Sequence, residues 1–234
     1  MDPRTLISDR KNWKWIGLGA VVLVLLLVIL VRRQHTSAER ATEFYSRYIP
    51  VTRSSVDRDE DGIDDQNDIL QSALAYCETR PRYKSKYYEG GYPTDRYGTC
   101  ADVVAAALKG AGYDLMKLVS EDREKNPDDY AVMAALAGVP DEEPDPNIDF
   151  RRVRNLEVYF SHTAIPMTLD LGEINAWQGG DIVIFDDHIG IVSDRRSIDG
   201  VPYVIHHNSA YQKRYEQDIL EARTDLRAHY RISQ

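Results

Sequence analysis

The chain has 234 residues and a formal net charge of −9, which is enough length for one modest domain with a real core plus accessory segments. Residues 1–33 carry six Lys or Arg and two Asp, a net charge of +4, which leaves −13 for the remainder. A domain this acidic repels phosphate backbones, so nucleic acid is excluded as a partner. The two cysteines are too few for a disulfide scaffold.

Residues 15–31 are almost uninterrupted apolar sequence with basic residues on both sides. They predict an N-terminal transmembrane helix, with Trp13 and Trp15 as interfacial anchors. A cleaved signal peptide is the alternative, but no small-x-small motif follows before the next Arg pair. We therefore expect a single-pass protein of the cell membrane. Residues 1–14 would be a cytoplasmic N-terminus, residues 32–56 a stalk, and the domain would lie on the extracytoplasmic side.

Residues 57–68 match the calcium-loop pattern D-x-D-x-D-G, in which a glycine turns the chain so that three carboxylates converge on one ion. Position 12 is an aspartate, whose shorter side chain is less suited to bidentate ligation. The alternative is an acidic, solvated turn. The predicted ligands of a structural Ca²⁺ are Asp57, Asp59, Asp61, the carbonyl of Ile63, Asp65 through a water molecule, and Asp68. No organic cofactor is expected.

The remaining pattern is helical first and strand-forming later. Residues 69–79 predict a helix with Cys77 on its apolar side, and residues 80–96 a tyrosine-rich loop that either forms a ligand groove or packs down. A helix begins at Cys100 and ends at Gly110 or Gly112, and further helices follow to about residue 162. The predicted strands are residues 182–185, 188–193, 202–208 and about 228–232.

Cys100 opens its helix directly after Thr99, a good capping residue. The unpaired backbone N–H groups and the positive end of the helix dipole would favour a thiolate, the nucleophilic form of cysteine. The alternatives are a small buried apolar residue, or a disulfide with Cys77, since an oxidising compartment permits one.

A nucleophilic thiol also needs a base and a third group that orients the base. Folding strand 188–193 against strand 202–208 brings His206, His207 or Asn208 opposite His188, and the loop length does not fix which. Gly190 removes a side chain where the Cys100 helix could press against the sheet.

Five motifs occur in an order that resembles one bacterial family, the domain-of-unknown-function group numbered 1287. This family is similar in plan to the NlpC-type papain-like cell-wall cysteine peptidases. The resemblance covers about residue 64 to the C-terminus. The motifs are Tyr-Gly-Thr-Cys-Ala-Asp-Val-Val at 97–104, Asp-Pro-Asn-Ile-Asp-Phe-Arg-Arg-Val at 145–153, Gly-Asp-Ile-Val at 180–183, His-Ile-Gly-Ile-Val-Ser at 188–193 and Tyr-Val-Ile-His at 203–206.

The resemblance implies an α+β fold over residues 64–234, with a papain-like core in which the cysteine-bearing helix packs on an antiparallel sheet. It implies that Cys100 is the nucleophile, His188 the base and His206 the third member. The chain departs from the family pattern at this point, since an extra histidine stands between His206 and Asn208. We thus expect a membrane-anchored, exported cysteine hydrolase that cleaves an amide bond, plausibly in peptidoglycan stem peptides. A catalytically inactive wall-peptide-binding module of the same fold, stabilised by calcium, is the alternative.

Overall fold

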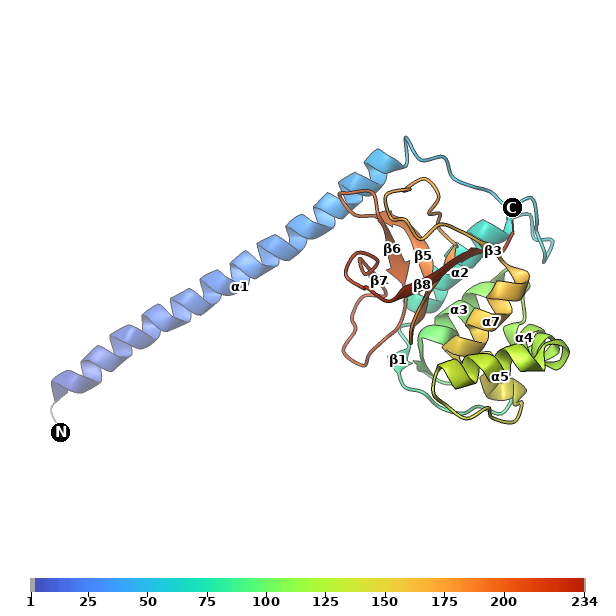
Figure 1. Cartoon of the computed structure of the whole chain (residues 1–234). Coiled ribbons are helices and arrows are strands. Elements are labelled where there is room, and N and C mark those ends of the chain that lie inside the picture. Colours follow the sequence, from blue (N-terminus) through green and yellow to red (C-terminus); the bar gives the residue numbers. More distant parts are fainter. Residues whose placement is uncertain (1–2, 234) are drawn as a thin grey trace.

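The computed structural model describes the backbone of residues 3–233 and the side chains of residues 15–30 and 39–233. One long helix, α1 (Pro3–Tyr45), projects from an α+β domain that holds the rest of the chain (Figure 1). The predicted cytoplasmic segment 1–14 and the first part of the stalk have side chains outside the described residues.

The predicted transmembrane helix is wrong. Within residues 15–30 and 39–233, whose side chains are described, no helix has an apolar stretch long enough to cross a membrane.

Six shorter helices lie on one side of the domain (Figure 1). The second helix begins four residues before its predicted start, because Asp64 caps it by accepting from the backbone N–H of Asn67. The helix that opens at Cys100 ends at Gly110, as predicted. The bounds are α2 (Asp65–Glu78), α3 (Cys100–Gly110), α4 (Leu115–Lys125), α5 (Pro127–Leu136), α6 (Pro146–Asp149) and α7 (Val153–Thr163).

A six-stranded antiparallel sheet has the strand order β3-β8-β4-β5-β6-β7. The two-residue strands β3 and β7 are its edges and were not predicted. The bounds are β3 (Ile165–Pro166), β4 (Ile182–Phe185), β5 (Ile189–Arg196), β6 (Pro202–Ile205), β7 (Glu216–Gln217) and β8 (Leu226–Arg231). Outside it, β1 (Arg82–Tyr83) pairs in parallel with β2 (Tyr97–Gly98) directly before α3.

The core has two parts, because side chains alternate between the two faces of a strand. On one face, Ile189, Ile191 and Ile205 pack against α2 and α3 in the main core. On the other face, Val192 and Val204 pack in a smaller cluster around Trp177. Strand alternation therefore decides which side chains at the start of β5 face α3.

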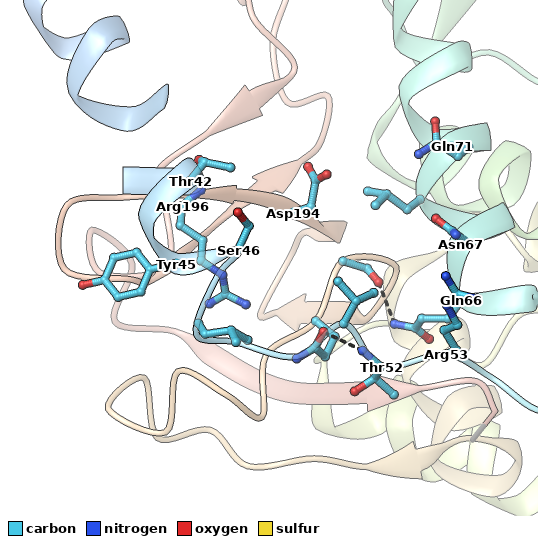
Figure 2. A pocket seen from close by; sticks show the side chains of 15 residues that line it. Thr42, Tyr45, Ser46, Thr52, Arg53, Gln66, Asn67, Gln71, Asp194 and Arg196 are labelled. Atoms are coloured by element: carbon cyan, nitrogen blue, oxygen red, sulfur yellow. Dashed lines mark hydrogen bonds between the residues drawn. The ribbon is translucent and has the colours of Figure 1, made fainter. Parts of the chain in front are cut away.

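The last turns of α1 contact the domain. Tyr45 donates its hydroxyl to the carbonyl of Ile198, and the backbone N–H of Arg196 donates to Thr42 Oγ1 over 2.9 Å. A cavity of about 360 Å³ lies at this junction, with side chains of α1 and α2 on opposite sides of it (Figure 2). None of the predicted catalytic residues lines this cavity.

Candidate active site

Cys100 is the first residue of α3, and the start of this helix is held by a buried ion pair. Asp102 accepts from the backbone N–H of Thr99 over 2.7 Å and from the Thr99 hydroxyl over 3.0 Å. Arg151 donates to both oxygens of the same carboxylate, over 2.6 and 2.9 Å. Arg151 lies in the Asp-Phe-Arg-Arg motif, to which sequence analysis assigned no role, and through this residue the motif helps to fix the position of Cys100.

The electrostatic state of Cys100 is opposite to the prediction. Burial raises the pKa of the Cys100 thiol to about 11, while the backbone N–H groups of Ile189 and Ala101 act in the lowering direction. Cys100 is only 9 % exposed, so the cost of desolvating a thiolate exceeds what the helix N-terminus contributes. The resting residue is a neutral thiol.

His188 and His206 are in direct contact, with His188 Nε2 2.8 Å from His206 Nδ1 and the rings nearly perpendicular. Ile191 pairs with Ile205 in the antiparallel sheet. One residue further along, His206 therefore lies opposite Gly190, which makes His188 and His206 diagonal neighbours on one face of the sheet. A Cβ on Gly190 would lie 2.5 Å from Val204 Cγ1 and 3.2 Å from His206 Cβ. Gly190 thus makes room for β6 and not, as expected, for the Cys100 helix.

Both histidines are neutral at pH 7. Burial first, then the neighbouring His206, lowers the pKa of His188 to about 3. Burial lowers the pKa of His206 to about 4, and the side chain of Gln217 acts in the raising direction. His206 Nε2 is buried and has no hydrogen-bond partner among the described residues. Sequence reasoning missed Gln217, because its place depends on the unpredicted strand β7.

The Cys100 sulfur lies at the start of β5, where it contacts the backbone N–H of Ile189, the residue that follows His188. Among the described side chains, however, no hydrogen bond joins this sulfur to the His188 ring. His188 lies on the same sheet face as Phe185, with ring centroids 6.1 Å apart, whereas Ile189 faces α3. The structure brings the three residues to one end of the sheet and joins only the two histidines directly.

His207 and Asn208 take other positions. His207 is buried on the α3 side, with its ring 5.2 Å from Tyr83 and 5.1 Å from Tyr215. Asn208 is exposed, and its backbone N–H donates to Gln212 Oε1 over 2.6 Å. His206 is therefore the one of the three alternatives that meets His188.

Cys77 and Cys100 are both free, so the disulfide alternative is not what the structure has. Burial, with Glu216 as a second cause, raises the pKa of Cys77 to about 12. Cys77 is an apolar core residue of α2, as its helical spacing predicted.

The tyrosines of residues 80–97 divide between the two predicted roles. Tyr88 is buried, and Tyr92 packs on Phe150 with ring centroids 4.9 Å apart. Tyr83 and Tyr97, held by the β1–β2 pairing, instead line a cavity of about 750 Å³ that Cys77 and His207 also line. This part of the loop can contact a ligand.

The predicted calcium loop brings together ligand oxygens of Asp57, Asp59 and Asp61 within 4.8 Å of one another. Gly62, at φ +94°, provides the expected turn, and its N–H donates to Asp57 Oδ2 over 2.9 Å. Burial first, and then the charges of Asp61, Asp59, Asp57 and Asp65, raise the pKa of Asp68 to about 6.

Asp68 and Asp65 differ in the hydrogen-bond partners of their carboxylate oxygens. Asp68 Oδ2 is buried and has no partner. Both oxygens of Asp65 are already engaged, one by the backbone N–H of Arg58 over 2.8 Å and one by the Tyr113 hydroxyl. The converging donor set that fits a divalent cation consists of the three carboxylates of Asp57, Asp59 and Asp61, and Asp68 has the unpartnered oxygen that Asp65 lacks.

The site thus consists of a helix-borne cysteine beside a histidine pair on the strands of an antiparallel sheet. Residues 70–232 match the family Domain of unknown function (DUF1287), and the chain belongs to it. The chain is 38% identical over 147 residues to "Uncharacterized protein YijF" of Escherichia coli (strain K12). The aligned region covers 60% of this chain and 67% of that protein. No solved structure matches the chain significantly.

Proposed function

We propose that this domain is a cysteine hydrolase that cleaves an amide bond, with Cys100 as the nucleophile and His188 as the base. The observation that carries the proposal is the 2.8 Å contact between His188 Nε2 and His206 Nδ1, one residue from the Ile189 amide that meets the Cys100 sulfur. A wall peptide remains the proposed substrate, on the strength of the motif resemblance alone.

The histidine contact determines which nitrogen can act. If His188 Nε2–H donates to His206 Nδ1, then His188 Nδ1 carries no proton and can accept one. His206 then carries its proton on Nε2, toward the side chain of Gln217, whose amide oxygen is the acceptor it needs. His206 and Gln217 are positioning residues in this arrangement.

Because thiol and imidazole are both neutral at rest, the proton must move as the carbon–sulfur bond forms. Substrate binding must first bring the thiol and His188 Nδ1 to hydrogen-bond distance, which is common for sites that tighten only around substrate. The Cys100 sulfur then attacks the carbonyl carbon, and its proton passes to His188 and on to the leaving amine. The backbone N–H groups at the start of α3 stabilise the oxyanion, and water releases the acyl group.

A second candidate function is a catalytically inactive module that binds wall peptides through the same surface. The raised pKa of Cys100 and its burial favour it, since both lower the supply of thiolate.

Digestion of purified peptidoglycan by the full chain tests the hydrolase. New free amino groups and cleaved stem peptides, seen by mass spectrometry with wild type and lost with Cys100→Ala and with His188→Ala, support it. If wild type and Cys100→Ala give identical products while both sediment with the wall, the hydrolase is wrong and the binding module stands.

We also propose that Asp57, Asp59, Asp61 and Asp68, with the Ile63 carbonyl, hold a structural Ca²⁺. The support is the convergence of the first three carboxylates and the unpartnered, buried Oδ2 of Asp68. A divalent cation there would relieve the mutual repulsion that raises the pKa of Asp68.

A further inference from the structure

The cavity of about 750 Å³ is lined by His207, which follows His206 in the chain, and by Tyr97, three residues before Cys100. Cys77 lines it as well, whereas Cys100 does not. Tyr83 and His207 line it, and their rings are 5.2 Å apart. A ligand in this cavity would therefore contact residues that neighbour Cys100 and His206 in the chain.

The cavity is cationic in an otherwise acidic chain. Arg80, Arg82 and Lys213 line it, and no Asp or Glu does. Across residues 15–30 and 39–233, none of the three forms an ion pair, and all three side chains are exposed, unlike the ion-paired Arg123, Arg151 and Arg231, which are buried. A cleft lined by charges of one sign concentrates ligands of the opposite sign.

Arg80 occupies a position that favours glycine. It follows the C-cap of α2 with φ +51°, and its N–H donates to the carbonyl of Cys77 over 3.0 Å. Glycine ends helices in this left-handed conformation without strain, whereas arginine does not. Strained non-glycine residues cluster at ligand sites, so the side chain of Arg80 is a candidate for direct contact.

His207 supplies a neutral polar group at the inner end of the cavity. The residue is 1 % exposed, and its Nδ1 is buried without a hydrogen-bond partner. An unpaired buried polar atom is costly, and a ligand oxygen or N–H would satisfy it.

We propose that this cavity binds a carboxylate-bearing part of the peptide substrate, through Arg80, Arg82 and Lys213, with His207 as the neutral contact. The assignment of the ligand as a substrate rests on the proposed hydrolase, while the anion site itself rests on the cavity. Arginine binds carboxylates through paired N–H groups, and lysine adds a point charge.

Calorimetric titration of full-length Cys100→Ala tests the site without turnover. The probes are the dipeptide Ala-Glu, with two carboxylates, and Ala-Gln-amide, which has nearly the same shape and none. We expect Ala-Glu to bind at least tenfold more tightly, with an affinity that falls as salt is added. Arg82→Gln should weaken Ala-Glu binding about tenfold, and Lys117→Gln, which removes an exposed charge on α4, should not change it.

Arg80→Gly separates a binding role from a structural one. Glycine relieves the strain at φ +51°, so this variant should melt at a higher temperature and still bind Ala-Glu about tenfold more weakly. Equal affinity for the two dipeptides, no saturable binding of Ala-Glu, or unchanged binding by Arg80→Gly would overturn the proposal. Binding of Ala-Glu by a chain that cleaves no wall amide would refute the hydrolase and leave the anion site standing.

Discussion

Arg151 binds Asp102 through two parallel contacts, Nε to Oδ1 over 2.6 Å and Nη2 to Oδ2 over 2.9 Å. The same carboxylate accepts from the backbone N–H of Thr99, directly before Cys100. A pair of side chains that are 2 % and 0 % exposed thus fixes where α3 begins and where the sulfur lies.

Replacing one member of this pair should leave an uncompensated buried charge. We expect Arg151→Met to lower the free energy of unfolding by about 3–5 kcal/mol, measured by urea denaturation. The matched control is Arg227→Met, since Arg227 pairs with Glu157 at an exposed site and should cost less than about 1 kcal/mol. Equal losses in the two variants would show that the Asp102 contact is no more important than a surface pair.

The reactivity of Cys100 should follow its raised pKa. Labelling by iodoacetamide at Cys100 should be slow at pH 7 and rise about tenfold per pH unit up to its pKa of about 11. Because folding raises this pKa, the associated stability is complete below the ordinary thiol value and is lost as pH rises toward 11. Mass spectrometry of the labelled peptide, with Cys77→Ser to remove the other thiol, gives the profile. An apparent pKa below 8 would contradict the effect of burial.

Protonation of the buried histidine pair should destabilise the domain at low pH. Both pKa values are lowered from 6.5, to about 3 and about 4, so the associated stability is complete above pH 6.5 and is lost as pH falls through 4 and 3. Each histidine should account for about 3 kcal/mol of lost stability at pH 4. Thermal melts of wild type and His206→Gln between pH 7 and pH 4 measure it: the variant should lose less. Parallel loss in both chains would count against a buried neutral pair.

Gly190 should accept no side chain. In Gly190→Ala the new Cβ would lie 2.5 Å from Val204 Cγ1 and 2.9 Å from the Ile205 carbonyl, so β6 must shift. We expect a loss of about 1–3 kcal/mol in stability together with a loss of activity, since His206 moves with β6. Gly172→Ala is a control, because the contacts there are only with the exposed side chain of Asp170. Full activity of Gly190→Ala would refute the role of the histidine contact.

Removal of calcium should destabilise the domain modestly. At a calcium concentration of 10–100 times the dissociation constant, bound ion contributes about 1.4–2.7 kcal/mol, so a chelator should lower the melting temperature by several degrees. Asp61→Asn should melt at the chelated temperature and no longer respond to calcium. Asp128→Asn, an exposed acid on α5, should respond as wild type does. An identical melt with and without chelator in wild type would disprove the site.

The sequence by itself determined the elements that local chemistry controls. Helix α3 follows from Thr99 and its run of helix formers, β4 follows from four buried apolar residues, and Gly62 determines the turn of the acidic loop. The motif order also gave the family, which the match over residues 70–232 confirms.

Tertiary structure decided what depends on contacts between distant residues. Strand register selected His206 over its two neighbours, and the depth of Cys100 reversed the expected direction of its pKa shift. Neither the choice of His206 nor the pKa shift of Cys100 can be predicted from the local sequence, because strand pairing and desolvation depend on which distant segments pack against a residue. The same holds for the basic cavity. Lys213 is far from Arg80 and Arg82 in the sequence, and the three line one cavity only in the folded chain.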